Sequence, residues 1–313
     1  MLENGKWSAE WHPVQATDKQ GGFVRQTSSF RHWISADGSS EFAAEPDRYH
    51  LYVALICPWA SRTLIARSLK GLEQIVSVSV VEPQLGAQGW RFGDYPGADR
   101  DQLNNAEYLH QLYTRADADF TGRATVPVLW DKKTQTIVNN ESADILRMFN
   151  SGFGDLADNR LDLYPEDLRS EIDALNATIY PRLNNGVYRT GFATTQVSYQ
   201  QAFNEVFEQL DELEQRLKDG RTFLLGERLT EANIRLFVTL IRFDVTYHGL
   251  FKCNLRRLRD YPLLDRYLKS VLAVSGVRQT VNIDHIKQGY YSIKALNPNG
   301  IVPAGPDMAD YGF

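Results

Sequence analysis

Cysteine is scarce in this chain, with Cys57 and Cys253 as its two examples among 313 residues. Two cysteines are too few for a disulfide scaffold and too few for a structural zinc site built on thiolates. The six histidines are scattered, and none forms the i, i+4 pair of a helical metal site. We therefore expect a reducing, cytoplasmic compartment and no metal.

Long apolar runs and blocks of like charge are also missing. No stretch of about 20 apolar residues occurs, so we expect no membrane-spanning helix and no membrane partner. The first residues lack the apolar core of a signal peptide. The net charge of −5 argues against a nucleic-acid partner. With these classes set aside, 313 residues suffice for two globular domains.

The N-terminal part predicts an arm followed by a first domain. Residues 1–48 have little periodicity but several aromatic residues, so we expect an extended arm that rests on the body of the protein. Residues 49–150 then give the order strand, helix, strand, hairpin and helix, which is typical of a thioredoxin-like domain. The expected elements are strands at 49–55, 75–81, 126–130 and 135–138, and helices at 58–70 and from 141.

The remaining segments divide into loops and helices. Residues 82–125 form a long Gly-, Asp- and Asn-rich insertion, with one helix expected near 105–115. Residues 150–164 have the composition of a linker. Residues 165–313 are expected to form an all-helical domain, because apolar residues recur there at helical spacing. Its clearest helices are expected at 197–218, 230–241 and 263–274.

Cys57 stands where the first strand pattern gives way to a helix pattern, in Leu-Ile-Cys-Pro-Trp-Ala at 55–60. Pro58 suits the first turn of a helix, where a missing N–H has no cost. We therefore expect Cys57 at or beside a helix N-cap, where the positive end of the dipole favours a thiolate below the usual thiol pKa of about 8.5. The alternative is a small buried hydrophobic residue, the usual state of an unpaired cysteine.

A second thiol is absent three residues after Cys57, since position 60 is Ala60. This excludes a local dithiol mechanism, and burial is the expected state of Cys253 in the helical domain. Turnover at Cys57 therefore needs an external thiol, for which glutathione is the natural candidate. Glu141 can pair with the ammonium group of its γ-glutamyl part, and the Ser142 N–H at a helix start can hold the carboxylate. The alternative for this pair is ordinary helix capping.

The pattern resembles the glutathione transferase superfamily and, within it, the Xi class, which is the class of glutathionyl-hydroquinone reductases. The resemblance runs from about residue 23 to residue 306. It implies an α/β thioredoxin-like N-terminal domain plus an all-α C-terminal domain, the glutathione transferase fold, in a homodimer. The matching segments are Cys-Pro-Trp-Ala at 57–60, Gly-Trp-Arg-Phe at 89–92, Thr-Val-Pro-Val-Leu-Trp-Asp at 125–131, Asn-Glu-Ser at 140–142, Gly-Val-Tyr at 186–188, Arg-Phe-Asp at 242–244, Phe-Lys-Cys-Asn-Leu-Arg-Arg at 251–257 and Asn-Pro-Asn-Gly-Ile-Val-Pro at 297–303.

The resemblance also assigns site residues. It implies that Val126, before an expected cis Pro127, binds the cysteinyl part of glutathione through its backbone. It implies that Trp90 contacts glutathione and that Arg123 meets the glycyl carboxylate, although a surface aromatic anchor and a solvated charge are the alternatives. Tyr188, Tyr290 and Tyr247 are the candidates to bind a ring hydroxyl and supply a proton, with a core or interface role as the alternative for each.

The implied reaction is reductive deglutathionylation of a small-molecule S-glutathionyl-hydroquinone. Cys57 takes the glutathionyl group as a mixed disulfide, and a second glutathione releases hydroquinone and oxidised glutathione. An omega-like glutathione transferase or thioltransferase is the alternative enzyme, and a non-enzymatic glutathione transferase-like module is the alternative outside catalysis. The intact Cys57, Val126 and Glu141–Ser142 favour the reductase.

Two positions depart from the family pattern. A helix-opening motif that usually ends in Asp ends here in Asn233, for which we expect a small stability cost because an amide accepts a weaker hydrogen bond. Many members have His-Tyr-Tyr near the C-terminus, whereas this chain has Gly289, Tyr290 and Tyr291. Which of the two tyrosines faces the substrate is left open by the sequence.

Overall fold

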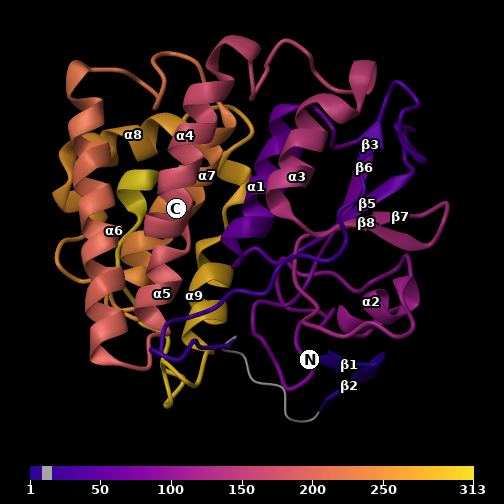
Figure 1. The fold of residues 1–313 in the computed structure, drawn as a ribbon, viewed down its shortest axis with the longest axis horizontal. Coiled ribbons are helices and arrows are strands. Elements are labelled where there is room, and N and C mark those ends of the chain that lie inside the picture. The colour runs from indigo at the N-terminus through magenta and orange to yellow at the C-terminus, as the bar shows by residue number, and fades with distance from the viewer. Residues whose placement is uncertain (9–15) are drawn as a thin grey trace. The chain divides into compact units, whose positions relative to one another are not determined.

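The computed structural model describes residues 1–8 and 16–313, and these residues fall into two compact units. The first unit contains residues 1–8, 26–162 and 280–289. The second contains residues 16–25, 163–279 and 290–313. The N-terminal arm is therefore divided between the two units. Residues 280–289 of the predicted helical domain belong to the first unit. Figure 1 labels the elements of both units.

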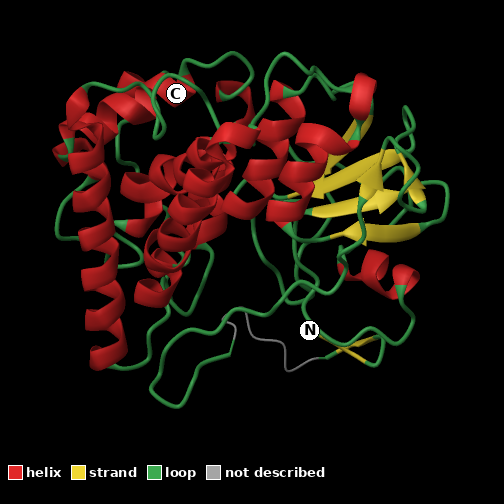
Figure 2. Cartoon of the chain, turned by 45° about the horizontal axis from the view of Figure 1, so that its top comes forward, coloured by secondary structure: helices red, strands yellow, loops and turns green. Residues whose placement is uncertain are grey.

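A four-stranded sheet forms the centre of the first unit (Figure 2). The strand order is β6-β5-β7-β8, with β5 and β6 parallel and the other pairs antiparallel. All five residues of β5 are buried, as expected of an apolar run in a sheet centre. The predicted strand–helix–strand unit and hairpin are confirmed. The strands are β5 Tyr49–Val53, β6 Val76–Val80, β7 Val128–Asp131 and β8 Thr136–Asn139.

Three helices accompany this sheet. Helix α1, Pro58–Leu69, packs against α3, Ser142–Arg147, and α2, His110–Ala116, contacts β8. The helix expected near residue 105 begins five residues later than predicted. The buried Asp101 carboxylate accepts bonds from the N–H groups of Leu103, Asn104 and Ala106, so residues 101–106 form a closed loop before α2 can start.

The N-terminal arm rests on the body through aromatic side chains, as predicted. In the first unit, Trp7 stacks on His110 with ring centroids 4.6 Å apart, and Phe30 packs on Tyr113. Trp33 differs from this pattern because 43% of it is exposed. Trp11 lies outside the described residues. The arm also forms the short strands β1 Leu2–Glu3, β2 Lys6–Trp7, β3 Ile34–Ser35 and β4 Phe42–Ala43.

The second unit is built of helices, which confirms the all-helical prediction for this part of the chain. The predicted helix at 197–218 is α6, and it buries one stripe of apolar residues. Within the described residues, no helix is long and apolar enough to cross a membrane. The helices are α4 Arg169–Ile179, α5 Gly186–Gly191, α6 Gln196–Arg216, α7 Glu231–Arg242 and α8 Pro262–Leu272; α9 Ile283–Tyr291 starts in the first unit and ends in the second.

The expected linker at 150–164 is more ordered than its composition suggests. Residues up to Asp162 belong to the first unit. The Asn150 amide donates to the Asp162 carboxylate at 2.8 Å, and the Lys70 ammonium donates to the Leu161 carbonyl at 2.5 Å. These contacts join the segment to the end of α1, so the boundary between the units lies after residue 162.

Both polar atoms of the Asn233 side-chain amide form hydrogen bonds at the start of α7. Its Oδ1 accepts from the Leu224 N–H and from the Tyr267 hydroxyl, both at 3.0 Å. Its Nδ2 donates to Thr230 Oγ1 at 3.1 Å, a bond that a carboxylate cannot donate. This third bond offsets the stability cost that the sequence led us to expect.

His50 gives the first unit a predictable pH dependence. The ring is buried between Ser77 Oγ at 2.7 Å and Ser79 Oγ at 3.0 Å, and burial lowers the pKa of His50 to about 4. The unfolded chain takes up this proton below a pKa of about 6.5. The stability that depends on neutral His50 is therefore complete above about pH 6.5 and is lost as the pH falls toward 4.

We expect urea unfolding to show this loss against a His50→Gln variant. Between about pH 7 and about pH 4.5, the free energy of unfolding of the wild type should fall by about 2 kcal/mol more than that of the variant. A difference between the two proteins that does not change with pH would contradict a neutral, buried His50.

Candidate functional site

Cys57 is the N-cap residue of α1, as predicted. Its backbone is extended (φ −76°, ψ 119°), Pro58 occupies the first helical turn, and the Cys57 carbonyl accepts the Ser61 N–H at 3.0 Å. The side chain is partly exposed and makes no capping hydrogen bond. The sulfur is therefore at the positive end of the helix dipole rather than in the core, which excludes the buried alternative.

Val126 and Pro127 lie beside this sulfur. The peptide bond between them is cis, as the resemblance implied. The Val126 carbonyl oxygen is 3.7 Å from Cys57 Sγ. The loop before β7 and the start of α1 thus place backbone polar groups and one thiol together within the first unit.

Glu141 and Ser142 stand at the start of α3. Glu141 is the N-cap residue, and its carboxylate accepts from the Ala143 N–H at 3.1 Å and from Ser28 Oγ at 3.0 Å. The ordinary capping alternative is therefore part of what this residue does. A carboxylate has acceptor capacity beyond two bonds, so capping leaves it able to pair with an ammonium group.

Arg62 is a site residue for which the sequence suggested no role. It is 1% exposed, it stacks on Trp59 with its guanidinium carbon 4.5 Å from the ring, and its Nη1 donates to Ser142 Oγ at 3.5 Å. It thereby joins the helix that carries Cys57 to the helix that begins at Ser142. The sequence offered no clear signal for it, since Arg67 and Lys70 are also basic residues in the helix pattern at 58–70.

Trp90 and Arg123 lie at the two ends of the long insertion. The Trp90 carbonyl accepts the Leu109 N–H at 2.9 Å, which pairs its segment with the residues before α2. The Arg123 N–H donates to Gln26 Oε1 at 3.0 Å. Both side chains are partly exposed. The first unit therefore holds Cys57 and every predicted glutathione-binding residue.

Three tyrosines of the second unit form a chain of hydroxyl groups. Tyr290 on α9 lies at its centre, with its hydroxyl 2.5 Å from that of Tyr188 on α5 and 2.8 Å from that of Tyr247. Tyr247 ends the π-helical turn Phe243–Tyr247 that continues α7. Phe251 packs on all three rings. These are the three tyrosines that the sequence analysis named.

The three tyrosines differ in their exposure. Tyr247 and Tyr290 are buried, and burial raises the pKa of each well above its usual range. Tyr188 is partly exposed. Tyr188 is therefore the exposed end of the hydroxyl chain, and Tyr290 and Tyr247 are its buried members.

The structure gives the positions of Tyr291 and Cys253. Tyr291 donates to the Val245 carbonyl at 3.3 Å and lies outside the hydroxyl chain, so Tyr290 is the member of the pair that joins the other tyrosines. Cys253 is fully buried, as predicted, and burial raises the pKa of its thiol to about 12. Cys253 is therefore unreactive at neutral pH.

Gly289 stands where many family members have histidine. A Cβ atom there would lie 2.5 Å from Ile56 Cδ1 and 2.6 Å from the Pro83 carbonyl oxygen. The backbone oxygen cannot rotate away as a side chain can, so a side chain fits at this point of α9 only if the backbone shifts. The glycine allows α9 to lie against the residue that precedes Cys57.

We therefore expect Gly289→Ala to lower the free energy of unfolding by about 1–2 kcal/mol. Overpacking costs about 1–3 kcal/mol, against a gain in helix propensity of up to about 1 kcal/mol. Gly249→Ala is the matched control, because its nearest neighbour would be 3.6 Å away. Urea denaturation measures both variants, and equal stabilities would show that the contact at Gly289 relaxes without cost.

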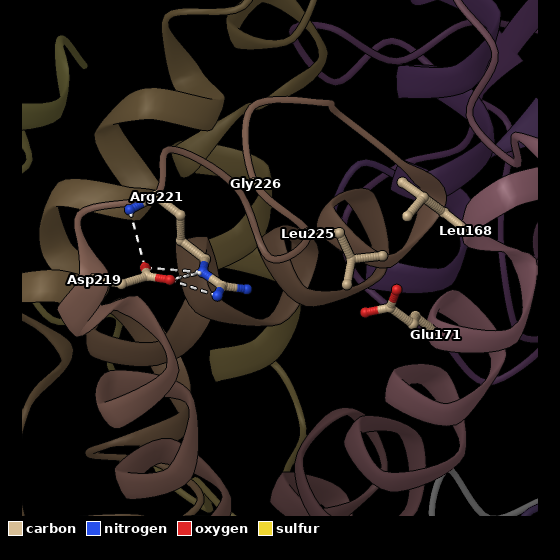
Figure 3. Close-up of a pocket in the computed structure, with 6 residues that line it drawn as sticks. All are labelled: Leu168, Glu171, Asp219, Arg221, Leu225 and Gly226. Carbon is tan, nitrogen blue, oxygen red and sulfur yellow. Dashed lines mark hydrogen bonds and ion pairs between the residues drawn. The ribbon is translucent and has the colours of Figure 1, made fainter.

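The second unit also contains a pocket lined by charged and apolar residues (Figure 3). Asp219 and Arg221 form an ion pair at one side, and Glu171 lies at the other. None of the predicted site residues lines it. Among the described residues, no three His, Cys, Asp or Glu side chains are grouped as metal ligands.

Comparisons with known proteins agree with this arrangement. Residues 56–151 match the family model of the glutathione S-transferase N-terminal domain, and residues 196–270 match that of the C-terminal domain. Glutathionyl-hydroquinone reductase PcpF of Sphingobium chlorophenolicum is 50% identical over 309 residues, which cover 98% of this chain and 96% of that protein.

Solved structures give the same result. The glutathione S-transferase Xi from Phanerochaete chrysosporium matches with a TM-score of 0.90 at 50% identity, covering 93% of this chain and 95% of that chain. The glutathione-bound structure of YqjG from Escherichia coli K-12 matches with a TM-score of 0.87 at 51% identity, covering 89% and 93%. The fold is thus the glutathione transferase fold, and the chain belongs to the Xi class of the glutathione S-transferase family, together with the glutathionyl-hydroquinone reductases that it resembles over almost its full length.

Proposed function

We propose that this protein is a glutathionyl-hydroquinone reductase that uses glutathione as its co-substrate. The observation that carries the proposal is Cys57: a partly exposed thiol at a helix N-cap, beside a cis-proline loop, with alanine where a resolving cysteine would stand. Such a thiol can attack a sulfur atom but depends on an external thiol to complete the cycle. The names of the relatives at 50% identity support the same activity.

The reaction balances in two steps. The Cys57 thiolate attacks the sulfur of an S-glutathionyl-hydroquinone, an S–S bond forms, and the carbon–sulfur bond breaks. The aromatic carbon leaves with the electron pair and takes up a proton. A second glutathione, as thiolate, then attacks the mixed disulfide, which releases oxidised glutathione and restores Cys57. The proton lost by that second glutathione equals the proton gained by the carbon.

The predicted glutathione-binding residues each have a part in this scheme. Glu141 pairs with the γ-glutamyl ammonium group, the Ser142 N–H and hydroxyl bind the carboxylate, and the Val126 backbone binds the cysteinyl part. Trp90 contacts glutathione and Arg123 meets its glycyl carboxylate. The buried Arg62 guanidinium, which donates to Ser142 Oγ, supports this arrangement because it fixes the Ser142 side chain.

The tyrosine chain supplies the proton in this proposal. Tyr188 is the donor because it is partly exposed, whereas Tyr290 holds its hydroxyl by a hydrogen bond and is itself hydrogen-bonded to Tyr247. A positioned general acid of this kind contributes about 10²–10⁴-fold to a rate. A homodimer and a cytoplasmic location complete the proposal; the first follows the family resemblance, and the second follows the scarcity of cysteine.

A turnover comparison separates this proposal from its alternatives. We expect rapid release of hydroquinone from a glutathionyl-hydroquinone with glutathione, and slow conjugation of chlorodinitrobenzene. The reverse preference would identify an ordinary conjugating transferase. Absence of both activities, together with absence of glutathione binding in calorimetry, would identify a non-enzymatic module.

A further inference from the structure

Residues 16–25 of the N-terminal arm belong to the second unit and attach to the start of α6. The Gln20 carbonyl accepts from Thr195 Oγ1 at 2.7 Å and from Ser198 Oγ at 2.8 Å. The Gly21 carbonyl accepts from the Thr194 N–H at 3.0 Å. Three hydrogen bonds therefore fix the path of the arm shortly before it reaches helix α5.

Two arm residues then contact Tyr188 directly. Phe23 is buried and packs on Tyr188 and Phe192, with ring centroids 6.3 Å and 5.6 Å away. The Arg25 guanidinium carbon lies 4.7 Å from the centroid of the Tyr188 ring. Its Nε donates to Asn185 Oδ1 at 2.9 Å, one turn before Tyr188 on the same helix segment. The position of this cation on the ring is thus set by an independent hydrogen bond.

The arm and the helices of the second unit carry other charged groups, which have partners of their own. Asp18 in the arm accepts N–H groups of its own loop, at Gln20 and Gly22. On α5, Arg189 pairs with Glu205 of α6. In the π-helical turn, the Asp244 carboxylate accepts the Leu258 N–H, and on α7 the Arg242 guanidinium donates to the Val238 carbonyl. Arg242 also acts electrostatically on Tyr247 and Tyr290, which belong to the hydroxyl chain.

We propose that Arg25 is a positioning residue for Tyr188, and that its guanidinium group on the ring face stabilises the phenolate formed when Tyr188 gives its proton to the departing hydroquinone carbon. The inference rests on the proposed function. In this step the Tyr188 O–H bond breaks, a carbon–hydrogen bond forms, and negative charge remains on the phenolate. The phenolate then regains a proton from water. The incoming glutathione thiol gives its own proton to the hydroxide that remains.

Through Arg25, the N-terminal arm takes part in the reaction. A cation over an aromatic ring contributes more when it is desolvated, and Arg25 is partly buried. Loss of the charge leaves Tyr188 a weaker acid, so proton transfer to carbon slows. Thiol–disulfide exchange at Cys57 includes no proton transfer to carbon and does not depend on this group.

The test uses the full chain with Arg25→Met and Arg25→Lys. For deglutathionylation of a glutathionyl-hydroquinone, we expect Arg25→Met to lower kcat about tenfold and to move the alkaline limb of the kcat–pH profile up by about half a unit to one unit. Arg25→Lys, which keeps the charge, should recover most of kcat and return the limb toward its original pH. Arg189→Met is the matched control, because Arg189 adjoins Tyr188 but pairs with Glu205.

Reduction of a glutathionyl mixed disulfide by the same proteins completes the design. Arg25→Met should reduce it at the wild-type rate, which shows that the fold and Cys57 are intact. Wild-type kcat in Arg25→Met, an unmoved alkaline limb, or equal losses in both reactions would each overturn the role of Arg25. If the wild type itself does not turn over the glutathionyl-hydroquinone, the proposed function fails, and the inference fails with it.

Discussion

Cys57→Ala is expected to lower the rate of deglutathionylation by at least about 10³-fold, because the nucleophile is lost and no second thiol lies nearby to replace it. Cys253 cannot take over, since it is fully buried and burial raises its pKa to about 12. The free energy of unfolding should change by less than about 1 kcal/mol, because Cys57 is partly exposed and makes no capping bond. Steady-state kinetics and urea denaturation measure the two effects.

Cys57→Ser separates loss of the nucleophile from loss of the site. A hydroxyl can stabilise a bound glutathione thiolate but does not form a stable mixed disulfide with it. We therefore expect Cys57→Ser to lose deglutathionylation and to gain conjugation of chlorodinitrobenzene. Cys253→Ala is the control and should keep wild-type turnover. Near wild-type deglutathionylation by Cys57→Ala would remove the basis of the proposed mechanism.

Tyr188→Phe is expected to have the second largest effect, a loss of about 10²-fold in kcat for the glutathionyl-hydroquinone. The variant keeps the ring that packs on Phe23, Phe192 and Phe251 and removes the hydroxyl that meets Tyr290. Reduction of a glutathionyl mixed disulfide should be unchanged, because that reaction does not need the proton. Parallel assays of the two reactions give the measurement.

Tyr291→Phe is the matched control for this variant. It removes a hydroxyl from the residue that follows Tyr290 on α9, where the hydroxyl donates to the Val245 carbonyl and not to the tyrosine chain. We expect it to keep kcat within about twofold of wild type. Equal effects of Tyr188→Phe and Tyr291→Phe would show that the hydroxyl chain has no special part in the reaction.

The local patterns of the sequence were sufficient for the first unit's framework. The mostly apolar run at 49–55 and the Cys-Pro step predicted β5, α1 and the N-cap position of Cys57, because each depends on neighbouring residues. The start of α2 was misplaced, because the Asp101 carboxylate that closes the preceding loop also binds the Tyr52 hydroxyl, 49 residues away in sequence. Such a contact leaves no periodic signal.

Long-range pairing explains the other differences. Sequence spacing could not decide between Tyr290 and Tyr291, since adjacent residues of a helix point about 100° apart and the rotation of α9 depends on its packing. The Gly289 contact with Ile56 and Pro83 contributes to that packing. Arg25 and Arg62 were missed for the same reason, because an arginine over an aromatic ring appears in a sequence as an ordinary charged residue.

The division of the arm between the two units also depends on long-range contacts that the sequence does not predict. Residues 16–25 follow the second unit through hydrogen bonds to Thr194, Thr195 and Ser198. Residues 26–48 follow the first unit, where the His32 N–H donates to the Val138 carbonyl at 3.0 Å. Both attachments join residues more than 100 positions apart, so composition alone indicated one continuous extension.

The most direct test of the transfer to Cys57 is peptide mass spectrometry after one turnover without added glutathione. The protein is mixed with one equivalent of a glutathionyl-hydroquinone, quenched in acid and digested. We predict one glutathionyl group on the peptide that contains Cys57, one equivalent of hydroquinone in solution, and loss of the adduct when glutathione is added. Hydroquinone release with an unmodified Cys57, or an adduct on Cys253 alone, would contradict the mechanism.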